Sequence, residues 1–125
     1  MAMSTSVLVI DDDPGFRALA VRMLGGMGLH VVGEADTVAS ATRAATALRP
    51  QSALVDVGLP DGDGVALARI LVAMPWAPRV VLTSSDRDAT TDSDAQYVGA
   101  AGFIAKDDLP SGLLRALLTG IDEQE

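Results

Sequence analysis

The sequence predicts an α/β fold, a three-layer sandwich in which helices cover both faces of a five-stranded parallel sheet. Short apolar runs rich in Val, Ile and Leu alternate with longer segments whose apolar residues recur at helical spacing. Strands that alternate with helices form right-handed crossovers, and such crossovers produce a parallel sheet. The chain has 125 residues, 49% of them hydrophobic and 21% charged, which is typical of one globular domain.

Five short apolar runs predict the strands of this sheet. Each run is too short for a helix, and its composition is typical of a strand that is buried on both faces. The runs are Val7–Ile10, Leu29–Val32, Ala53–Val57, Val80–Leu82 and Phe103–Ala105.

Four segments with apolar residues at helical spacing predict helices between and after the strands. The first ends in a glycine-rich stretch, the second is closed before Pro50, and the third is stopped by two prolines. Asp36 or Thr37 is the expected cap of the second helix, and Pro110 is tolerable in the first turn of the last one. The apolar positions span Phe16–Met27, Val38–Leu48, Leu67–Met74 and Leu113–Leu118.

The segment Ser84–Gln96 differs from these four helices. It is rich in Asp, Ser and Thr and contains almost no apolar residue. A helix in this segment has little apolar surface to bury, so we expect helix four to be short, frayed or late-starting. We find no internal repeat and no domain boundary, and therefore expect a single domain over residues 1–125 with a core from about residue 7 to residue 118.

The composition excludes several kinds of function. Acidic residues outnumber Lys and Arg by 17 to 9, and the formal charge of −8 opposes direct contact with nucleic acid. The chain has no cysteine, which excludes disulfides and thiolate metal sites. No apolar run approaches the ~20 residues of a membrane-spanning helix, and the N-terminus shows no export signal, so we expect a cytoplasmic protein without membrane contact.

The carboxyl ends of the predicted strands carry a set of charged and hydroxyl side chains. Asp11 and Asp12 end the first strand, Asp56 lies near the end of the third, and Thr83 and Lys106 end the fourth and fifth. Parallel α/β sheets bind ligands at this edge, so we expect the five side chains to meet there. Clustered carboxylates repel one another, and a hard cation relieves that repulsion. The absence of His, Cys and Met from these positions favours Mg²⁺.

This set of groups suits phosphoryl transfer. A carboxylate beside a cation and an ammonium group can attack phosphorus, while the two positive charges neutralise the oxygens of the transferring group. A hydroxyl donates a hydrogen bond to one of those oxygens. For three other aspartates the sequence favours structural roles. Asp13 is expected to cap a helix, and Asp61 and Asp63 are expected to form a turn with a cap for helix three.

Four sequence motifs together resemble the receiver domains of two-component response regulators. The motifs are VLVIDDDPGFR, ALVDVGLPDGDG, VVLTSSD and GAAGFIAKDDLP, and their order and spacing are specific although each alone is weak. The resemblance covers about Val7 to Leu118. It implies a flavodoxin-like fold with the strand order 2-1-3-4-5, which is the topology of this family.

The resemblance also implies a role for each matching acidic position. Asp56 corresponds to the aspartate that accepts the phosphoryl group. Asp11 and Asp12 correspond to the acidic pair, with Asp12 in direct contact with Mg²⁺ and Asp11 in contact through water. Gly58 corresponds to the position whose backbone carbonyl binds the metal. The expected metal ligands are therefore Asp11, Asp12, Asp56 and the Gly58 carbonyl.

Three further positions carry the activation mechanism that the resemblance implies. Lys106 corresponds to the lysine that pairs with the acceptor and then with the phosphate. Thr83 corresponds to the switch hydroxyl that turns toward the phosphoryl oxygen, and Phe103 to the aromatic side chain that becomes buried when the threonine moves. Such a domain catalyses only its own phosphorylation and dephosphorylation, and its partner is a histidine kinase or a histidine phosphotransfer protein.

The sequence departs from many receivers at Asp107, where they carry a proline in a cis peptide bond. That variant resembles the subfamily whose receivers precede helix-turn-helix DNA-binding domains. The chain is therefore expected to be either a stand-alone receiver or the N-terminal part of a transcriptional regulator. The weak helix four affects the output face, formed by helix four, strand five and helix five, where the resemblance implies homodimer formation.

Two other functions remain open from the sequence. The motif VLVIDDDPG also fits phosphatases that use an aspartyl nucleophile, with Asp11 as the attacking group and Asp13 as the acid or base. Such enzymes need a cap or a larger core for the substrate, and this sequence has no such insert. The other possibility is a receiver-like interaction module whose acidic pocket is never used.

Overall fold

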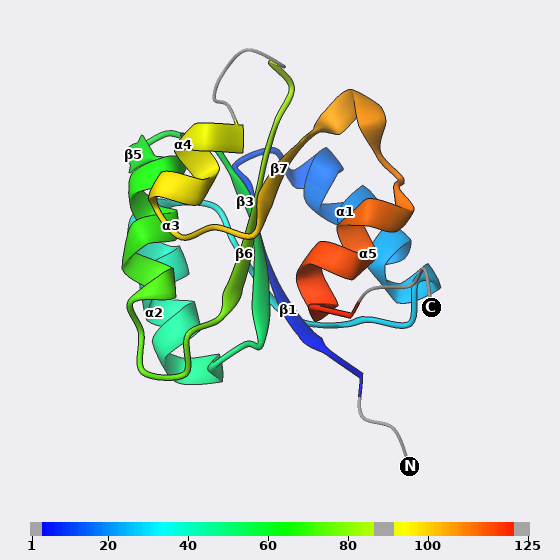
Figure 1. The fold of residues 1–125 in the computed structure, drawn as a ribbon, viewed down its shortest axis with the longest axis horizontal. Helices are drawn as coiled ribbons and strands as arrows, with labels where there is room; N and C mark the ends of the chain where they lie inside the picture. Colours follow the sequence, from blue (N-terminus) through cyan, green and yellow to red (C-terminus); the bar gives the residue numbers. More distant parts are fainter. Residues whose placement is uncertain (1–3, 87–91, 122–125) are drawn as a thin grey trace.

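A five-stranded parallel sheet forms the centre of the molecule in the computed structural model, which describes residues 4–86 and 92–121 (Figure 1). Its order is β2-β1-β3-β6-β7, and every neighbouring pair is parallel. This order confirms the expected 2-1-3-4-5 arrangement, counted over the long strands. The strands are β1 (Ser6–Ile10), β2 (His30–Ala35), β3 (Ser52–Asp56), β6 (Arg79–Ser84) and β7 (Gly102–Ala105).

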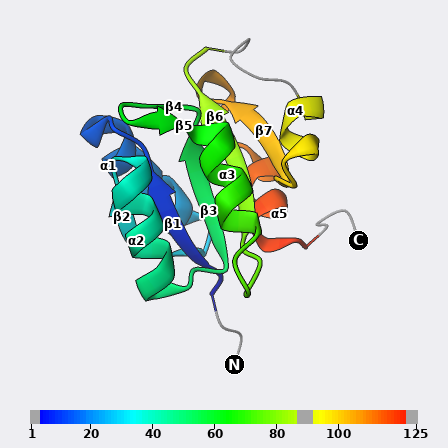
Figure 2. The same cartoon turned by 90° about the vertical axis from the view of Figure 1, so that its left-hand side faces the viewer.

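Five α-helices cover the two faces of the sheet within the described residues, as the sequence predicts. Helices α1 and α5 lie on one face, and α2, α3 and α4 lie on the other (Figures 1 and 2). The helices are α1 (Pro14–Gly26), α2 (Val38–Leu48), α3 (Gly64–Val72), α4 (Asp92–Tyr97) and α5 (Gly112–Thr119). None of the helices in the described part of the chain is long and apolar enough to cross a membrane.

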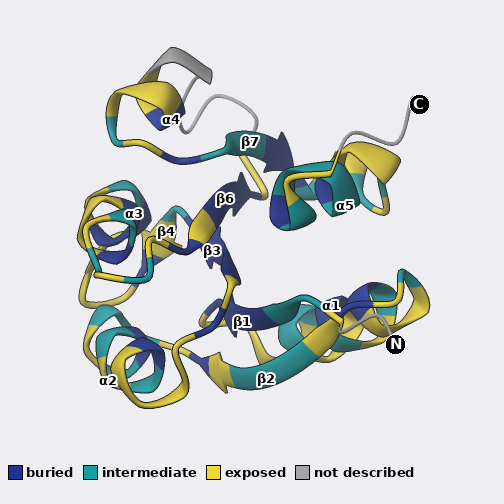
Figure 3. Cartoon of the chain, turned by 60° about the horizontal axis from the view of Figure 1, so that its bottom comes forward, coloured by how far each residue is buried: buried dark blue, intermediate teal, exposed yellow. Residues whose placement is uncertain are grey.

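The core consists of two apolar clusters, one on each face of the sheet. Successive strand residues point to opposite faces, so Val9 and Leu54 pack beneath α1 and α5 while Leu8 and Val55 pack beneath α2 and α3. The central strand β3 is buried at every residue, and the buried colour runs through the middle of the sheet in Figure 3. Burial on both faces explains why the strands appear in the sequence as continuous apolar runs.

Helix α4 confirms the expectation of a short, late-starting fourth helix. It has only six residues and begins at Asp92, eight residues after β6 ends at Ser84. Ala95 is fully buried against the core, whereas Tyr97 is 82% exposed. The part of the expected segment that covers residues 87–91 lies outside the described residues.

Two short elements and several boundaries differ from the prediction, among them the end of β2, which lies at Ala35 and not at Val32. A small antiparallel hairpin of β4 (Gly58–Leu59) and β5 (Gly62–Asp63) follows β3, and a 3₁₀ helix, η1 (Lys106–Asp108), follows β7. Pro110 was wrongly placed in the first turn of the last helix. Ser111 caps α5 by accepting a hydrogen bond from the backbone of Leu113, so the helix begins after the proline. The Leu109–Pro110 peptide bond is cis.

Side-chain caps define where several helices begin. Asp13 caps α1 and Asp63 caps α3, and both confirm their predicted roles. Asp61 lies in the turn before that cap, as expected, and has a further role. From the hairpin, Asp61 accepts hydrogen bonds from the backbone N–H groups of Val38 at 2.7 Å and Ala39 at 3.1 Å, the first two residues of α2. It therefore joins the loop after β3 to a helix far away in the sequence.

Asp61→Ala is expected to lower the thermal midpoint of unfolding at neutral pH. The hydrogen bond from Val38 is the largest cause that holds the pKa of Asp61 below its ordinary value. A lowered pKa in the folded state means that the stabilisation is present above the unfolded pKa, about 4, and is lost as the pH falls through the folded pKa. Thermal melts from pH 7 down to pH 3 check this.

Asp107→Ala is the matched control for that series, because Asp107 is an exposed aspartate in η1 that makes no helix cap. The difference between wild type and Asp61→Ala should shrink as the solution becomes acidic, while the control remains close to wild type at each pH. A difference between wild type and Asp61→Ala that is constant over the whole range would contradict the role of the charged carboxylate.

Candidate functional site

Three carboxylates converge at the carboxyl edge of the sheet, as predicted. Asp11 and Asp12 follow β1, and Asp56 ends the neighbouring strand β3. One oxygen of each side chain lies within 4.8 Å of the oxygens of the other two. Asp11 and Asp56 are buried, whereas Asp12 is exposed. The arrangement is one buried pair of carboxylates with a third at the solvent side.

Lys106 supplies the positive charge of the site. Its Nζ atom lies 2.7 Å from Oδ2 of Asp11 and 3.9 Å from Oδ2 of Asp56. The lysine begins η1 directly after β7, at the far edge of the sheet, and its side chain reaches back to the centre with only 16% of its surface exposed. The sequence therefore placed Lys106 correctly, although its shortest contact is with Asp11.

Thr83 lies beside Asp56 because the two residues are register partners on β6 and β3. Its hydroxyl is fully buried and donates a hydrogen bond of 2.7 Å to the backbone carbonyl of Ile104 on β7. Phe103, the preceding residue on β7, is only partly buried and packs against the cluster beneath α2, α3 and α4. Thr83 thus lies on the strand next to the acceptor strand, and Phe103 lies one strand further out, on the edge strand β7.

Gly58 begins the hairpin that follows the acceptor strand. Its backbone N–H donates a hydrogen bond of 3.3 Å to Oδ1 of Asp56. The residue is exposed and has open space where a side chain would lie. The predicted role of Gly58 concerned its carbonyl, and the structure adds this contact from its amide.

The electrostatic environment raises the pKa of Asp56 above its ordinary value. Burial is the largest cause, and repulsion by the Asp11 carboxylate is the next; Asp12 adds a smaller repulsion. The Lys106 ammonium and the Gly58 N–H oppose the shift. Two buried carboxylates with one ammonium leave an excess of negative charge at the site, which an additional cation would relieve.

The donor set fits a hard divalent cation. All the converging side-chain atoms of the acidic cluster are carboxylate oxygens, the ligands that Mg²⁺ prefers. Oδ2 of Asp11 is buried and lies 2.7 Å from the Lys106 ammonium, and no other group in the described part of the chain donates a hydrogen bond to it. A buried oxygen with unused acceptor capacity, next to two other carboxylates, is suited to a cation or to its bound water.

Two residues at the start of α1 contact the site although the sequence did not single them out. Arg17 donates a hydrogen bond of 2.7 Å from Nη1 to the Asp11 carbonyl, and its Nε lies 3.1 Å from Oε1 of Glu34 on β2. The ring of Phe16 lies against the Lys106 ammonium, with 4.2 Å from Nζ to the ring centroid. Phe16 was expected only as an apolar position of the first helix, and no role was expected for Arg17, because helical spacing alone does not show which side chain reaches the site.

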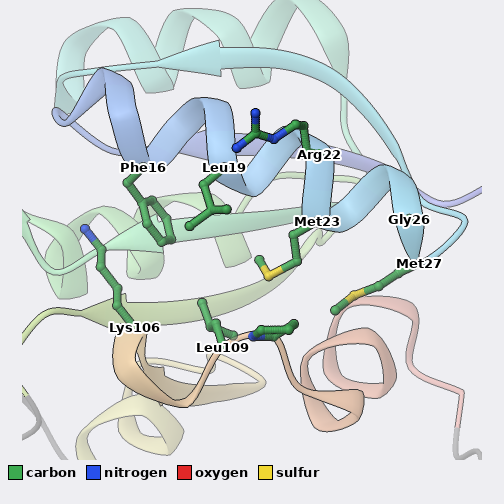
Figure 4. Close-up of a pocket in the computed structure, with 9 residues that line it drawn as sticks. Phe16, Leu19, Arg22, Met23, Gly26, Met27, Lys106 and Leu109 are labelled. Carbon is green, nitrogen blue, oxygen red and sulfur yellow. The ribbon is translucent and has the colours of Figure 1, made fainter.

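An apolar groove of about 500 Å³ adjoins the site between α1 and the segment that connects β7 to α5. Phe16 and Lys106 lie at one end of the groove, and Met23, Met27 and Leu109 line its remaining length (Figure 4). Leu19, on the rim, is 50% exposed. The side chain of Lys106 therefore contacts both the acidic cluster and the groove.

The fold and the site together define a class of protein: a flavodoxin-like α/β domain with an acidic pocket and a lysine at the carboxyl edge of its sheet. Residues 7–118 match the family model of the response regulator receiver domain. The chain belongs to this family and is a receiver domain of the two-component response regulators. The resemblance predicted from the motifs is confirmed.

Relatives in this family include transcriptional regulators. The DNA-binding transcriptional activator DevR/DosR of Mycobacterium tuberculosis is 41% identical over 113 residues, which are 89% of this chain and 52% of that protein. The signal receiver domain of the putative response regulator NarL from the same organism has a TM-score of 0.81 and 34% identity, with 95% of this chain and 97% of that chain covered.

Receivers also occur in proteins with other outputs. A protein-glutamate methylesterase/protein-glutamine glutaminase of Halobacterium salinarum is 35% identical over 123 residues, which are 96% of this chain and 34% of that protein. The chain spans about half the length of the regulators DevR/DosR and NarL. The matched part is thus the receiver, and the outputs of these relatives differ.

Proposed function

We propose that this receiver accepts a phosphoryl group on Asp56 from the phosphohistidine of a histidine kinase or a histidine phosphotransfer protein, in a reaction that requires Mg²⁺. The observation that carries the proposal is the convergence of Asp56 with Asp11, Asp12 and Lys106 in one pocket. The family membership supports it, because receivers of two-component systems are the partners of histidine kinases.

The residues of the pocket divide the chemistry among them. An oxygen of Asp56 forms the new bond to phosphorus while the N–P bond of the donor breaks, and the electron pair of that bond returns to the imidazole nitrogen. Lys106 is close enough to both buried carboxylates to follow the negative charge onto the phosphoryl oxygens. Asp11, Asp12, Asp56 and the Gly58 carbonyl would hold Mg²⁺, which neutralises the charge of the transferring group.

The proposed switch begins at Thr83. Its hydroxyl now donates to the Ile104 carbonyl, and in the phosphorylated state it would donate to a phosphoryl oxygen instead. Phe103 is only partly buried and has surface left to bury when the threonine turns. This is a shift between two packings of the same fold, driven by a contact that only one of them makes.

Thr83→Ala is expected to leave the extent of phosphorylation largely intact but to uncouple it from the surface of α4, β7 and α5. The alanine lacks the hydroxyl that senses the phosphoryl oxygen, whereas Asp56 and Lys106 remain. Amide chemical shifts of β7 and α5, with and without beryllofluoride as a phosphoryl mimic, measure the coupling. Thr83→Ser retains the hydroxyl and should respond like wild type; a full response of Thr83→Ala would contradict the switch.

The test of the proposed function is the intact mass of the protein after incubation with acetyl phosphate or phosphoramidate. A Mg²⁺-dependent gain of one phosphoryl group is expected, and excess chelator should prevent it. Folded protein that gains no mass with either donor would contradict the proposal and favour an interaction module whose pocket is unused.

The phosphatase alternative has less support from the geometry. Its nucleophile would be Asp11, but that carboxylate is buried and lies 2.7 Å from the Lys106 ammonium. Its acid or base would be Asp13, which accepts a hydrogen bond from the backbone of Gly15 as the cap of α1. We therefore propose a domain that catalyses only its own phosphorylation and dephosphorylation.

The output that we propose follows the regulators among the relatives. We infer that the receiver controls a DNA-binding transcriptional regulator in the cytoplasm and makes no direct contact with DNA itself. The face formed by α4, β7 and α5 carries two exposed apolar side chains, Tyr97 and Leu113. These support homodimer formation through that face, which sedimentation of the phosphorylated and unphosphorylated protein would test.

A further inference from the structure

We propose that Phe16 is a positioning residue that holds the Lys106 ammonium at the phosphorylation site by a cation–π contact. The proposal rests on the proposed function and concerns how its lysine is kept in place. Nζ of Lys106 lies 4.2 Å from the centroid of the Phe16 ring, within the range of an attractive contact between an ammonium and the face of an aromatic ring. Figure 4 shows the two side chains adjacent at one end of the apolar groove.

The lysine needs such a contact because its two carboxylate partners do not hold it equally. It lies 2.7 Å from Asp11 but 3.9 Å from Asp56, so in the resting state its position favours the wrong carboxylate for the reaction. Its side chain also lines the apolar groove, and a long flexible lysine gains rotamer entropy if its ammonium leaves the carboxylates. The neutral ring attracts the ammonium without competing as a third charge.

The ring is itself held firmly relative to the acidic loop. Phe16 lies in the first turn of α1, whose start is fixed by the Asp13 cap. The next residue, Arg17, donates to the carbonyl of Asp11 and pairs with Glu34 on β2. Phe16 is therefore fixed to the same piece of backbone that carries Asp11, and its ring keeps a constant position relative to the acidic loop.

Phe16→Leu and Phe16→Tyr test the role of the ring. Leucine retains an apolar side chain but removes the aromatic face, and tyrosine retains the face. The initial rate of labelling by phosphoramidate with saturating Mg²⁺ should fall by roughly 3- to 30-fold in Phe16→Leu. Phe16→Tyr should remain near wild type. The Mg²⁺ dissociation constant should be similar in all three proteins, because no metal ligand is changed.

A spectroscopic readout reports on the contact without any phosphorylation. Lys106 is the only lysine in the chain, so labelling with ¹³C-lysine gives one set of side-chain resonances. The ε-methylene protons next to the ring should show an upfield ring-current shift in wild type and in Phe16→Tyr, and that shift should disappear in Phe16→Leu. Met23→Leu is the matched control: it alters the same groove and leaves the ring in place.

The outcomes separate this inference from the proposed function. If wild type is labelled and Phe16→Leu is labelled at the same rate, the positioning role is overturned and the proposed function stands. A slow Phe16→Leu whose Mg²⁺ affinity and melting temperature fall in parallel would indicate general disruption and overturn it as well. If wild type is not labelled at all, both proposals fall. Loss of rate and of the ring-current shift at unchanged Mg²⁺ affinity supports the assignment.

Discussion

Asp56→Asn is expected to abolish Mg²⁺-dependent phosphorylation while leaving the fold intact. The amide cannot act as the nucleophile toward phosphorus, so the mass gain should fall below roughly 1% of wild type. Asparagine has nearly the same shape as aspartate and can still accept the hydrogen bond from the Gly58 N–H. Intact-mass measurement with phosphoramidate, together with a circular dichroism spectrum, checks both parts of this prediction.

Asp107→Asn is the control, since it makes the same chemical change at an exposed aspartate in η1. It should be labelled like wild type. Peptide mapping of the labelled wild type should place the group on the peptide with Asp56. A label that persists in Asp56→Asn and maps to Asp11 would refute the receiver chemistry and restore the phosphatase alternative.

Asp56→Asn also has a predicted effect on the stability of the fold. Because burial and the Asp11 carboxylate raise the pKa of Asp56, folding favours its protonated form. The contribution of the Asp56 carboxyl to the stability of the folded state is therefore greatest below the pKa that it has in the unfolded chain, about 4. It declines as the pH rises through the raised pKa of the folded state. In chelator at pH 7, Asp56→Asn should melt a few degrees above wild type, and the difference should shrink toward pH 4.

Gly64→Ala is expected to destabilise the domain severely, by about 3 kcal/mol or more. Gly64 begins α3 immediately after the hairpin, and its N–H donates to the Val57 carbonyl at 2.7 Å. An added Cβ would overlap with the carbonyl oxygen of Asp56 and lie 2.7 Å from the Cα of Val57. These are backbone atoms at the end of the acceptor strand and directly after it, so they cannot move aside by changing a rotamer. Urea denaturation followed by circular dichroism measures the loss.

Gly112→Ala provides a matched control, because Gly112 is the first residue of α5 and a Cβ there meets nothing within 4 Å. Alanine is the better helix former, so this variant should be neutral or slightly more stable than wild type. Equal destabilisation of the two variants would show that the cost arises from helix starts in general. Unaltered stability of Gly64→Ala would contradict the close approach of α3 to the acceptor strand.

The sheet and the main site residues were predictable from the sequence for a physical reason. Strands buried on both faces leave continuous apolar runs, and the chain turns polar where each strand ends. The positions of Asp11, Asp56, Thr83 and Lys106 therefore followed from the parallel order of the strands. The weak helix α4 was also predictable, since its segment lacks the apolar residues that a longer helix would bury.

The features that the sequence did not reveal depend on contacts across the fold. Asp61 also accepts hydrogen bonds from the first residues of α2, because the hairpin places it beside a helix that begins more than twenty residues earlier. Phe16 resembles any apolar helix residue until the position of Lys106 is known. Local spacing also could not show that α5 begins only after Pro110. For Asp61 and Phe16 the partner is distant in sequence, and periodicity carries no information about it.

The hydrogen bond from Thr83 to the Ile104 carbonyl limits the activity of the domain in the absence of phosphorylation. In the proposed switch, the unphosphorylated domain must break this bond before it can sample its active packing. A buried hydrogen bond contributes about 1 kcal/mol net, which is roughly a fivefold reduction in the spontaneously active population. The hydrogen bond between Thr83 and the edge strand β7 thus lowers the fraction of unphosphorylated receiver that adopts the active packing. This effect is independent of the rate at which the kinase phosphorylates Asp56.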